Sequence, residues 1–502
     1  MTSPGLAYAQ RSPGATTCVV VGRFETAVVP DLQDYRAVFW LVDGEGGAHP
    51  PLGLAPGALQ PRPIESLDST RLTALLDQFV RHDSRRLPSV FVTDDAIHQH
   101  TEAYQSILTT TCAHLDGHRR VRDARQRDGF AWQKHVLQNL PAYARRRLPA
   151  SWRGALRGLP AFVCGTGPSL DFSAPQLGPL ASRGVVVAAD SALRTLARHG
   201  IAADIAVSID AAKEPDKCLP GEHRPARAVL SIVSPPGWLT AMPAETVCFA
   251  ASRQITTAWL AEIGIGWPDV TVAEYWGGTA LELARHLGCA PIYLFGLDLA
   301  LDPARPDRRH TADAEPSLYS TAPFDTSQRL PEVPGNYAPT VPTHILGDWQ
   351  VLDNRLAGWP VGLAYNVTDR GAWLRNTTLV HPDNFSLASP SVSKDGILSR
   401  LGTPDPAGAA LVAGAFSQIR ETARREAAAV PALRAALAKG GPPAAAAEFR
   451  LHFADQTLGR VLGAFSLKIM PHLMPPLEGD SVFWSTLIDE YSELLAVAQT
   501  VD

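Results

Sequence analysis

The stretch Phe162-Val-Cys-Gly-Thr-Gly-Pro-Ser-Leu-Asp171 decides how this chain is interpreted. A short apolar run ends in two glycines, a proline and a serine, and a helical start signal follows. The pattern predicts a buried strand that enters a tight turn, because glycine permits backbone angles and close approaches that other residues block. Free amide groups at such a turn can face a phosphate. The stretch therefore fits a nucleotide-phosphate site or a plain strand-to-helix turn.

Two better-known phosphate motifs are excluded at this turn. The dinucleotide fingerprint needs a third glycine where Leu170 stands, and a Walker loop needs Gly-Lys-Ser/Thr to follow. A nucleotide site at this turn would therefore be neither a dinucleotide fingerprint nor a Walker loop.

Composition is that of an ordinary soluble protein of 502 residues, with 45% apolar and 19% charged residues. Its net charge of −5 gives no electrostatic reason to expect nucleic-acid binding. The six cysteines are scattered without a CxxC pair, which favours free thiols in a reducing compartment over disulfides or a zinc site. The first residues lack a signal peptide, and no apolar run approaches the roughly 20 residues of a membrane span. We expect a cytoplasmic protein without a transmembrane segment.

Three regions are predicted along the chain. Residues 1–130 have the pattern of a small α/β domain, and residues 131–389 that of a larger Rossmann-like α/β domain. Residues 390–403 are predicted to be a linker. The rest of the region 390–502 is alanine-rich and helical, which is typical of a bundle. The bundle is expected to pack on the core or on another subunit, which leaves a homo-oligomer open.

Alternation of strands and helices is clearest between residues 160 and 300. Helical patterns lie between several of the strands, and three of them end at a glycine: Gly200, Gly264 and Gly288. Strands that alternate with helices of this length indicate βαβ units and a mostly parallel sheet. The predicted strands are 161–164, 185–189, 204–209, 229–233, 246–250, 270–273 and 291–295.

Polar residues follow six of these strands. The carboxyl ends of parallel strands meet at one edge of the sheet, where ligands bind, so six polar loops are expected to line one cleft. A single aspartate is more often a helix cap, and Asp190 has this second interpretation. The polar positions are Gly165-Thr166-Gly167, Asp190-Ser191, Asp210, Ser234, Glu274 to Thr279 with Gly277 and Gly278, and Asp298.

A long segment rich in proline, aspartate and arginine covers residues 301–345. Loops of this length are often functional lids or disordered. His310 lies in this segment, twelve residues after Asp298. A lone histidine is usually only a surface residue, but a histidine on a lid is also a candidate general base.

With these residues assembled, the chain resembles the motility-associated factor glycosyltransferases, whose central domain is similar to a hydroxymethylpterin diphosphokinase. The resemblance covers roughly 130–375, and Thr166 and Leu297 depart from the usual family residues. The motifs that carry it are Asn139-Leu140, Cys164 to Asp171, Ala188 to Leu193, His199-Gly-Ile201, Val207 to Asp210, Gly277-Gly-Thr279, Leu287-Gly288, Gly296 to Ala300, His310, Val333 to Asn336, Val341-Pro-Thr343 and Tyr365-Asn366.

This resemblance implies that a nonulosonic acid, of the pseudaminic or legionaminic type, moves from its CMP-activated form to Ser or Thr hydroxyls of flagellin. The glycine turn is also similar to that of bacterial sialyltransferases. His310 is then the expected base, with Asp298 beside it, and Asn336 and Thr343 are expected to contact sugar or acceptor. The residues expected to bind the donor nucleotide are Gly165, Thr166, Gly167, Pro168, Ser169, Asp190, Ser191, Asp210, Gly277, Gly278 and Thr279.

No cofactor and no metal ion are expected for this transfer. Residues 160–390 contain no Asp-x-Asp pair, and a monophosphate leaving group needs less charge compensation than a diphosphate. One alternative is a diphosphokinase that uses Mg²⁺ and ATP on a pterin-like alcohol, with the same aspartates holding the metal. Another is a non-catalytic scaffold that binds a nucleotide or flagellin.

Overall fold

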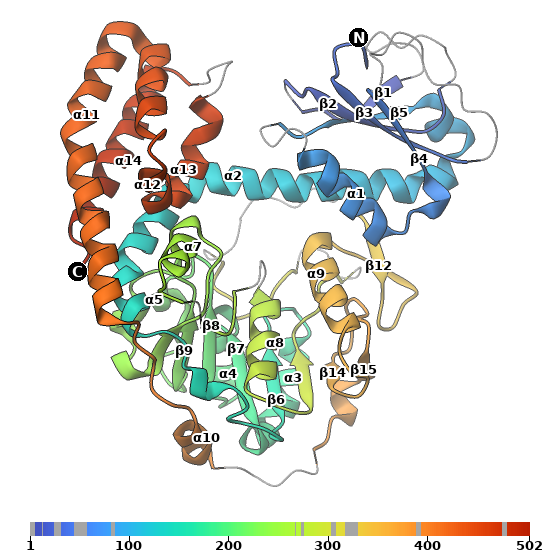
Figure 1. Ribbon diagram of the computed structural model, residues 1–502. Coiled ribbons are helices and arrows are strands. Elements are labelled where there is room, and N and C mark those ends of the chain that lie inside the picture. Colours follow the sequence, from blue (N-terminus) through green and yellow to red (C-terminus); the bar gives the residue numbers. More distant parts are fainter. Residues whose placement is uncertain are drawn as a thin grey trace. The chain divides into compact units, whose positions relative to one another are not determined.

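In the computed structural model the chain forms two compact units (Figure 1). Unit 1 contains residues 1–123, 325–333 and 342–350, and unit 2 contains residues 124–324, 334–341 and 351–502. Each unit is described by itself. The structure describes residues 6–12, 14–24, 32–44, 58–81, 86–266, 268–272, 276–302, 308–316, 330–387, 393–473 and 479–502.

A five-stranded sheet is the centre of unit 1, with the strand order β1-β5-β2-β3-β4. Strand β1 pairs antiparallel with β5, and the other neighbours are parallel. Apolar side chains of the sheet pack against helix α1 (Ser69–Arg81) and the first half of α2 (Thr101–Arg145). The strands are β1 (Leu6–Gln10), β2 (Thr17–Val21), β3 (Ala37–Val42), β4 (Leu59–Pro63) and β5 (Ser89–Thr93).

Apolar runs bounded by turn residues at 18–22, 38–42 and 90–93 predict three of these strands, β2, β3 and β5, which are confirmed. It does not predict β1 and β4, which lie at the two edges of the sheet. Strand β4 reads Leu-Gln-Pro-Arg-Pro, and proline is confined to edge strands because it donates no hydrogen bond. Edge strands bury fewer apolar side chains and so give a weaker sequence signal.

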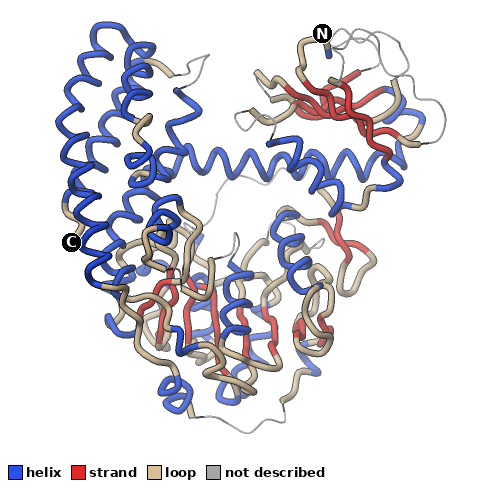
Figure 2. The backbone as a smooth tube through the Cα atoms, viewed as in Figure 1, coloured by secondary structure: helices blue, strands red, loops and turns tan. Residues whose placement is uncertain are grey.

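Most strands of unit 2, red in Figure 2, form one large sheet. It has eight strands in the order β10-β9-β8-β7-β6-β11-β14-β15, and every pairing is parallel. From β6 the chain first winds outward through β7 to β10 and then returns to the other side of β6 at β11. The strands are β6 (Ala161–Cys164), β7 (Val185–Ala189), β8 (Ile205–Ser208), β9 (Arg227–Leu230), β10 (Val247–Phe249), β11 (Ile292–Phe295), β14 (Ala364–Val367) and β15 (Thr377–Val380). A small ribbon of β12 (Glu332–Pro334) and β13 (Thr340–Pro342) lies outside both sheets.

The predicted α/β architecture with a parallel central sheet is therefore confirmed. The expected strand at 270–273 is wrong, because Thr271 makes only an isolated bridge to Ala251. Strand β15 is not predicted, since its side chains are half-buried or exposed.

Helices connect the strands of the large sheet, and α8 lies against β6, β7 and β8 (Figure 1). Helices α2 and α9 run through both units. The connecting helices are α3 (Leu170–Leu177), α4 (Leu193–Arg198), α5 (Pro215–Cys218), α6 (Trp238–Ala241), α7 (Ile255–Glu262), α8 (Trp276–His286) and α9 (Leu346–Ala357).

The C-terminal region is helical, as predicted, and its side chains join those of the sheet in one continuous hydrophobic core. The sequence Gly440-Gly-Pro-Pro443 predicts a break in this helical region, and Gly441, with a φ of 65°, breaks the long helix α11 there. The helices are α10 (Lys394–Arg400), α11 (Ala409–His452), α12 (Gln456–Val461), α13 (Gly463–Ile469) and α14 (Ser481–Gln499). The sequence Met474-Pro-Pro476 predicts a second break, but it lies outside the described residues. The division into a catalytic and a helical domain stays a prediction.

The predicted linker at 390–403 is wrong in part. Helix α10 lies within it and begins at Ser393, whose hydroxyl accepts a hydrogen bond of 3.3 Å from the amide of Gly396. This is an N-cap, which satisfies an amide that the first helical turn leaves unpaired. None of the helices that the structure describes combines the length and apolar character that crossing a lipid bilayer requires.

Candidate functional site

The carboxyl ends of the eight parallel strands form the candidate site. Strand order reverses between β6 and β11, and in open α/β sheets ligands bind at such a switch point. Strands β11, β6, β7 and β8 are consecutive neighbours in the sheet, so the loops that carry Asp298, Thr166, Asp190 and Asp210 leave the same edge. The predicted convergence of these loops agrees with the topology.

The glycine turn after β6 is closed by the strand next to it. The amide of Gly165 donates to the carbonyl of Phe295 at 2.7 Å, and the amide of Gly167 donates to the carbonyl of Gly296 at 2.8 Å. A Cβ added at Gly167 would lie 2.7 Å from Oδ2 of Asp298 and 2.8 Å from the Gly296 oxygen. Gly167 is therefore required by the close approach of two loops.

Asp298 holds the end of this turn. The amide of Ser169 donates to Asp298 Oδ2 at 2.8 Å, and the Ser169 hydroxyl donates to Oδ1 of the same carboxylate. Both side chains are buried. Burial raises the pKa of the Asp298 carboxyl to about 6, against the opposing effect of the two Ser169 hydrogen bonds. Asp298 thus caps the start of α3, the structural role that a turn aspartate often has.

These contacts correct one expectation from the sequence. The amides of Gly165, Gly167 and Ser169 and the Ser169 hydroxyl all donate within the protein, so they are not open donors for a phosphate. Pro168 has no amide proton. Thr166 is the exception: it is half-buried, and its amide and hydroxyl have no hydrogen-bond partner among the described residues. Any direct phosphate contact from this turn falls to Thr166.

Residues 308–316 of the predicted lid lie against the glycine turn. The amide of Thr311 donates to the Thr166 carbonyl at 3.0 Å, and the Thr195 hydroxyl donates to that of Thr311 at 2.8 Å. Asp171 forms an ion pair with Arg308 and accepts a hydrogen bond of 3.0 Å from the amide of Ala312. The segment is thereby held against the glycine turn at Arg308, Thr311 and Ala312.

His310 is brought to the site by these contacts. It directly precedes Thr311, whose amide binds Thr166, and the Cα atoms of His310 and Thr311 are about 3.8 Å apart. Its side chain is half-buried. The structure therefore places His310 beside Thr166 but connects Asp298 to Ser169.

Asp190 and Lys213 form a buried charged cluster at the ends of β7 and β8. Burial raises the pKa of Asp190, while the positive charge of Lys213 acts in the opposite direction. Asp190 also accepts a hydrogen bond of 2.6 Å from the amide of Ser191, as a cap does. The carboxylate of Asp210 is exposed and accepts from the amide of Ala212 at 2.9 Å. Lys213 is absent from the residues predicted from sequence. Its position three residues after Asp210, close to the end of β8, could have indicated it.

Gly277, Gly278 and Thr279 form the first turn of α8 and are buried. Because α8 precedes β11 and connects two parallel strands, its N-terminus lies at the carboxyl edge of the sheet. Residues 273–275, with the predicted Glu274, lie outside the described residues.

Asn336 binds the loop that follows β14 at the carboxyl edge of the sheet, whereas Thr343 lies in unit 1, and their expected contact with sugar or acceptor stays a prediction. The side-chain amide of Asn336 donates to the carbonyls of Arg370 at 2.9 Å and Ala372 at 3.0 Å, which fixes the loop after β14. That loop contacts Asp298 through its own backbone, because the Ala372 amide donates to the Asp298 carbonyl. Thr343 is fully buried in unit 1 and accepts a hydrogen bond from the Ile345 amide.

A separate cavity of about 1100 Å³ lies along α8 and α9 in unit 2. It is lined by five arginines, of which Arg153 pairs with Asp269 at 3.0 Å and Arg355 with Glu282 at 2.9 Å. The remaining three, Arg157, Arg253 and Arg285, have no carboxylate partner among the described residues. None of the sequence-predicted site residues lines it.

Comparison with known proteins gives a domain assignment. Residues 134–303 match the family described as "6-hydroxymethylpterin diphosphokinase MptE-like". The matched stretch is similar to an MptE-like domain. It contains the glycine turn, the Asp190–Lys213 cluster and Asp298, whereas His310 lies just beyond its end. The predicted central-domain resemblance is confirmed.

The whole chain is similar in structure to the MAf glycosyltransferase from Magnetospirillum magneticum AMB-1. The TM-score is 0.50 at 17% sequence identity, over 99% of this chain and 80% of that one. At this identity the likeness establishes the fold. It extends beyond the MptE-like domain to both flanking regions. No curated protein matches the chain.

Proposed function

We propose that this protein is a glycosyltransferase that moves a nonulosonic acid from a CMP-activated donor to Ser or Thr hydroxyls of flagellin. The observation that supports it most is the position of His310 beside Thr166 at the switch point of the sheet. An open donor and a candidate base at one strand edge suit transfer from an activated sugar to a hydroxyl. The fold shared with a MAf glycosyltransferase agrees with this proposal.

In the proposed reaction the bond between the anomeric carbon and the CMP phosphate breaks while negative charge grows on the phosphate. Thr166, through its amide and hydroxyl, stabilises the leaving phosphate. Lys213 and Asp190 lie at the neighbouring strand ends and hold the nucleotide. His310 accepts the proton of the acceptor hydroxyl, which then bonds to the anomeric carbon. Asp298 positions the turn through Ser169 and contacts no substrate.

Mass spectrometry of co-expressed flagellin tests the reaction, and His310→Ala tests the base. General-base catalysis typically contributes about 10²- to 10⁴-fold, so the variant should lose turnover by this factor. Calorimetric CMP binding should stay within about twofold of the unmodified protein, because a base acts on the acceptor. His98→Ala, at an exposed histidine in unit 1, is the matched control. Full flagellin modification by His310→Ala would contradict the assignment.

The arginine-lined cavity offers a check on where the donor binds. The double variant Arg157→Gln/Arg253→Gln removes two of its unpaired charges and should leave CMP binding unchanged. Thr166→Val should weaken it, because the variant loses the free hydroxyl at the turn. The opposite pattern would locate the donor in the cavity and remove the strand edge from the proposal.

A diphosphokinase acting on a pterin-like alcohol is the second candidate, favoured by the name of the family matched at 134–303. It requires ATP with Mg²⁺ bridging the phosphates. Calorimetry separates the two candidates: CMP binding without metal favours the transferase, and ATP binding that needs Mg²⁺ favours the kinase.

A further inference from the structure

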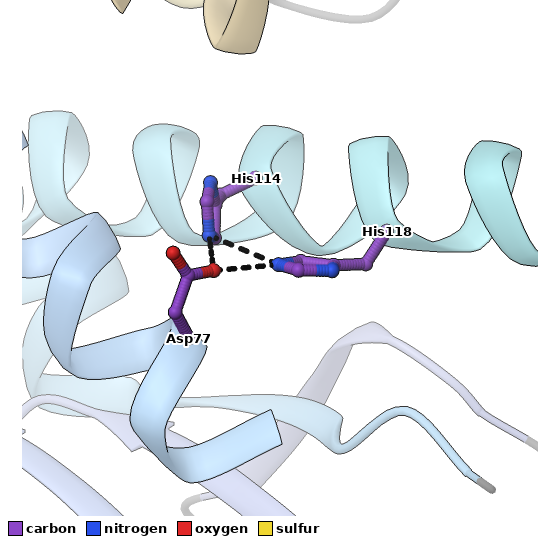
Figure 3. Close-up of side chains that lie close together, drawn as sticks. All are labelled: Asp77, His114 and His118. Atoms are coloured by element: carbon purple, nitrogen blue, oxygen red, sulfur yellow. Dashed lines mark hydrogen bonds and ion pairs between the residues drawn. The ribbon is translucent and has the colours of Figure 1, made fainter. Parts of the chain in front are cut away.

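A histidine pair and an aspartate meet in unit 1, far in the sequence from the strand-edge site. His114 and His118 lie four residues apart on α2, a spacing that puts both imidazoles on one face of the helix. Asp77 comes from α1 and faces them (Figure 3). The three side chains form the one group of His, Cys, Asp or Glu among the described residues whose ligand atoms lie close enough to hold a metal ion.

The distances within this cluster are short and point to one spot. Oδ1 of Asp77 lies 2.8 Å from Nε2 of His114 and 2.7 Å from Nε2 of His118. The two Nε2 atoms are 3.2 Å apart. Two imidazole nitrogens and one carboxylate oxygen thus converge (Figure 3).

These separations suit a tetrahedral ion. With metal–ligand bonds of about 2.0 to 2.1 Å, ligand atoms on a tetrahedron lie about 3.3 Å apart. The two nitrogens already have this spacing, and the aspartate oxygen would need to move out by only about 0.5 Å. Such a movement is within the reach of a side-chain rotation, because the Asp77 side chain is 42% exposed.

Solvent access also favours an ion here. The side chains of His114 and His118 are 14% and 34% exposed, so an ion can enter and water can take a fourth position.

We propose that Asp77, His114 and His118 bind a divalent zinc ion that links α1 to α2. Two imidazoles and one carboxylate form a ligand set typical of zinc, with the fourth position left to water. In the His-Leu-Asp-Gly-His sequence the residue after the first histidine is Leu115, which is buried, so no glutamate stands there to act as a base. An ion held by these three side chains ties α1 to α2 within unit 1. This site is independent of the proposed transferase function.

Zinc titration of the full-length, chelator-treated protein tests this proposal, with Co²⁺ as the spectroscopic probe. We expect one equivalent of zinc, and intense visible absorption from tetrahedral Co²⁺. His114→Gln, His118→Gln and Asp77→Asn should each weaken zinc binding by more than the roughly 10- to 100-fold that losing an outer-shell partner causes. Zinc should also raise the melting temperature of the unmodified protein and not that of these variants.

His100→Gln is the matched control, because His100 also bonds an aspartate, Asp95, at 2.6 Å but without a third ligand. It should bind zinc as the unmodified protein does. Equal zinc affinity in the control and the three cluster variants would overturn the proposal and leave a hydrogen-bonded cluster only. The Co²⁺ spectrum needs no variant, so weak octahedral absorption would overturn it even where a substitution disturbs folding.

Discussion

Replacing Gly167 with alanine should destabilise the protein by disturbing the contact between the glycine turn and Asp298. The new Cβ would lie 2.7 Å from Asp298 Oδ2 and 2.8 Å from the Gly296 carbonyl oxygen. Overpacking of this kind costs about 1–3 kcal/mol. If Asp298 moves aside, the buried Ser169 amide loses its acceptor, which costs about another 1–3 kcal/mol. We therefore expect Gly167→Ala to lower the free energy of unfolding by about 2–6 kcal/mol.

Urea unfolding followed by tryptophan fluorescence measures this loss, since Trp238 and Trp259 lie in the core of unit 2. Gly221→Ala is the control, because no atom lies within 4 Å of a Cβ built at Gly221. Its effect should stay within about 0.5 kcal/mol. Equal unfolding midpoints for the two variants would refute the close packing of the turn. CMP binding is the second measurement: retained binding by a destabilised Gly167→Ala would leave the turn a purely structural role.

Three further predictions concern the residues around this turn. Because burial raises the pKa of Asp298 from 3.8 to about 6, its contribution to stability is present below pH 4 and is lost as pH rises to 6. Relative to Asp298→Asn, the unmodified protein should lose about 2 kcal/mol of unfolding free energy between pH 4 and pH 6, as a pH series of urea titrations would show. Lys213→Met should destabilise by about 3–5 kcal/mol at pH 8, because it leaves the buried Asp190 carboxylate uncompensated, and should destabilise less at pH 5. Adding Asp190→Asn should recover most of that loss; no recovery would mean that the two charges do not interact. Asn336→Ala removes two hydrogen bonds to the loop after β14 and should destabilise by about 1–3 kcal/mol without abolishing CMP binding.

The sheet of unit 2 is largely predictable from sequence because its strands are buried on both faces. Runs such as Val185–Ala189 are fully apolar and end in polar residues, so both their existence and their carboxyl ends are visible. Edge strands β1, β4 and β15 carry no such run. Helix α10 is not predicted from the sequence, because it is short and lies among prolines and serines that are also typical of a linker.

Partners of the polar groups could not be predicted in the same way. The sequence shows Ser169 and Asp298 as two polar residues at strand ends, and both were expected to face a ligand. Only the neighbouring positions of β6 and β11 in the sheet reveal that they bond each other. Lys213 and the cluster of Asp77 with His114 and His118 also depend on pairs far apart in the chain. Such contacts are set by topology, which residue spacing does not encode.

Closure of the glycine turn changes the chemistry expected at this edge. A loop with free backbone amides could bind a phosphate through them alone. Here the amides of Gly165, Gly167 and Ser169 donate instead to β11 and to the loop that follows it. What the closure achieves is rigidity around Thr166, the one residue of the turn whose amide and hydroxyl are without a partner among the described residues. Its carbonyl meanwhile holds Thr311, and with it His310. In the proposed reaction, the same residue that stabilises the leaving phosphate thus fixes the distance to the base, so a change at Thr166 should impair donor binding and turnover together.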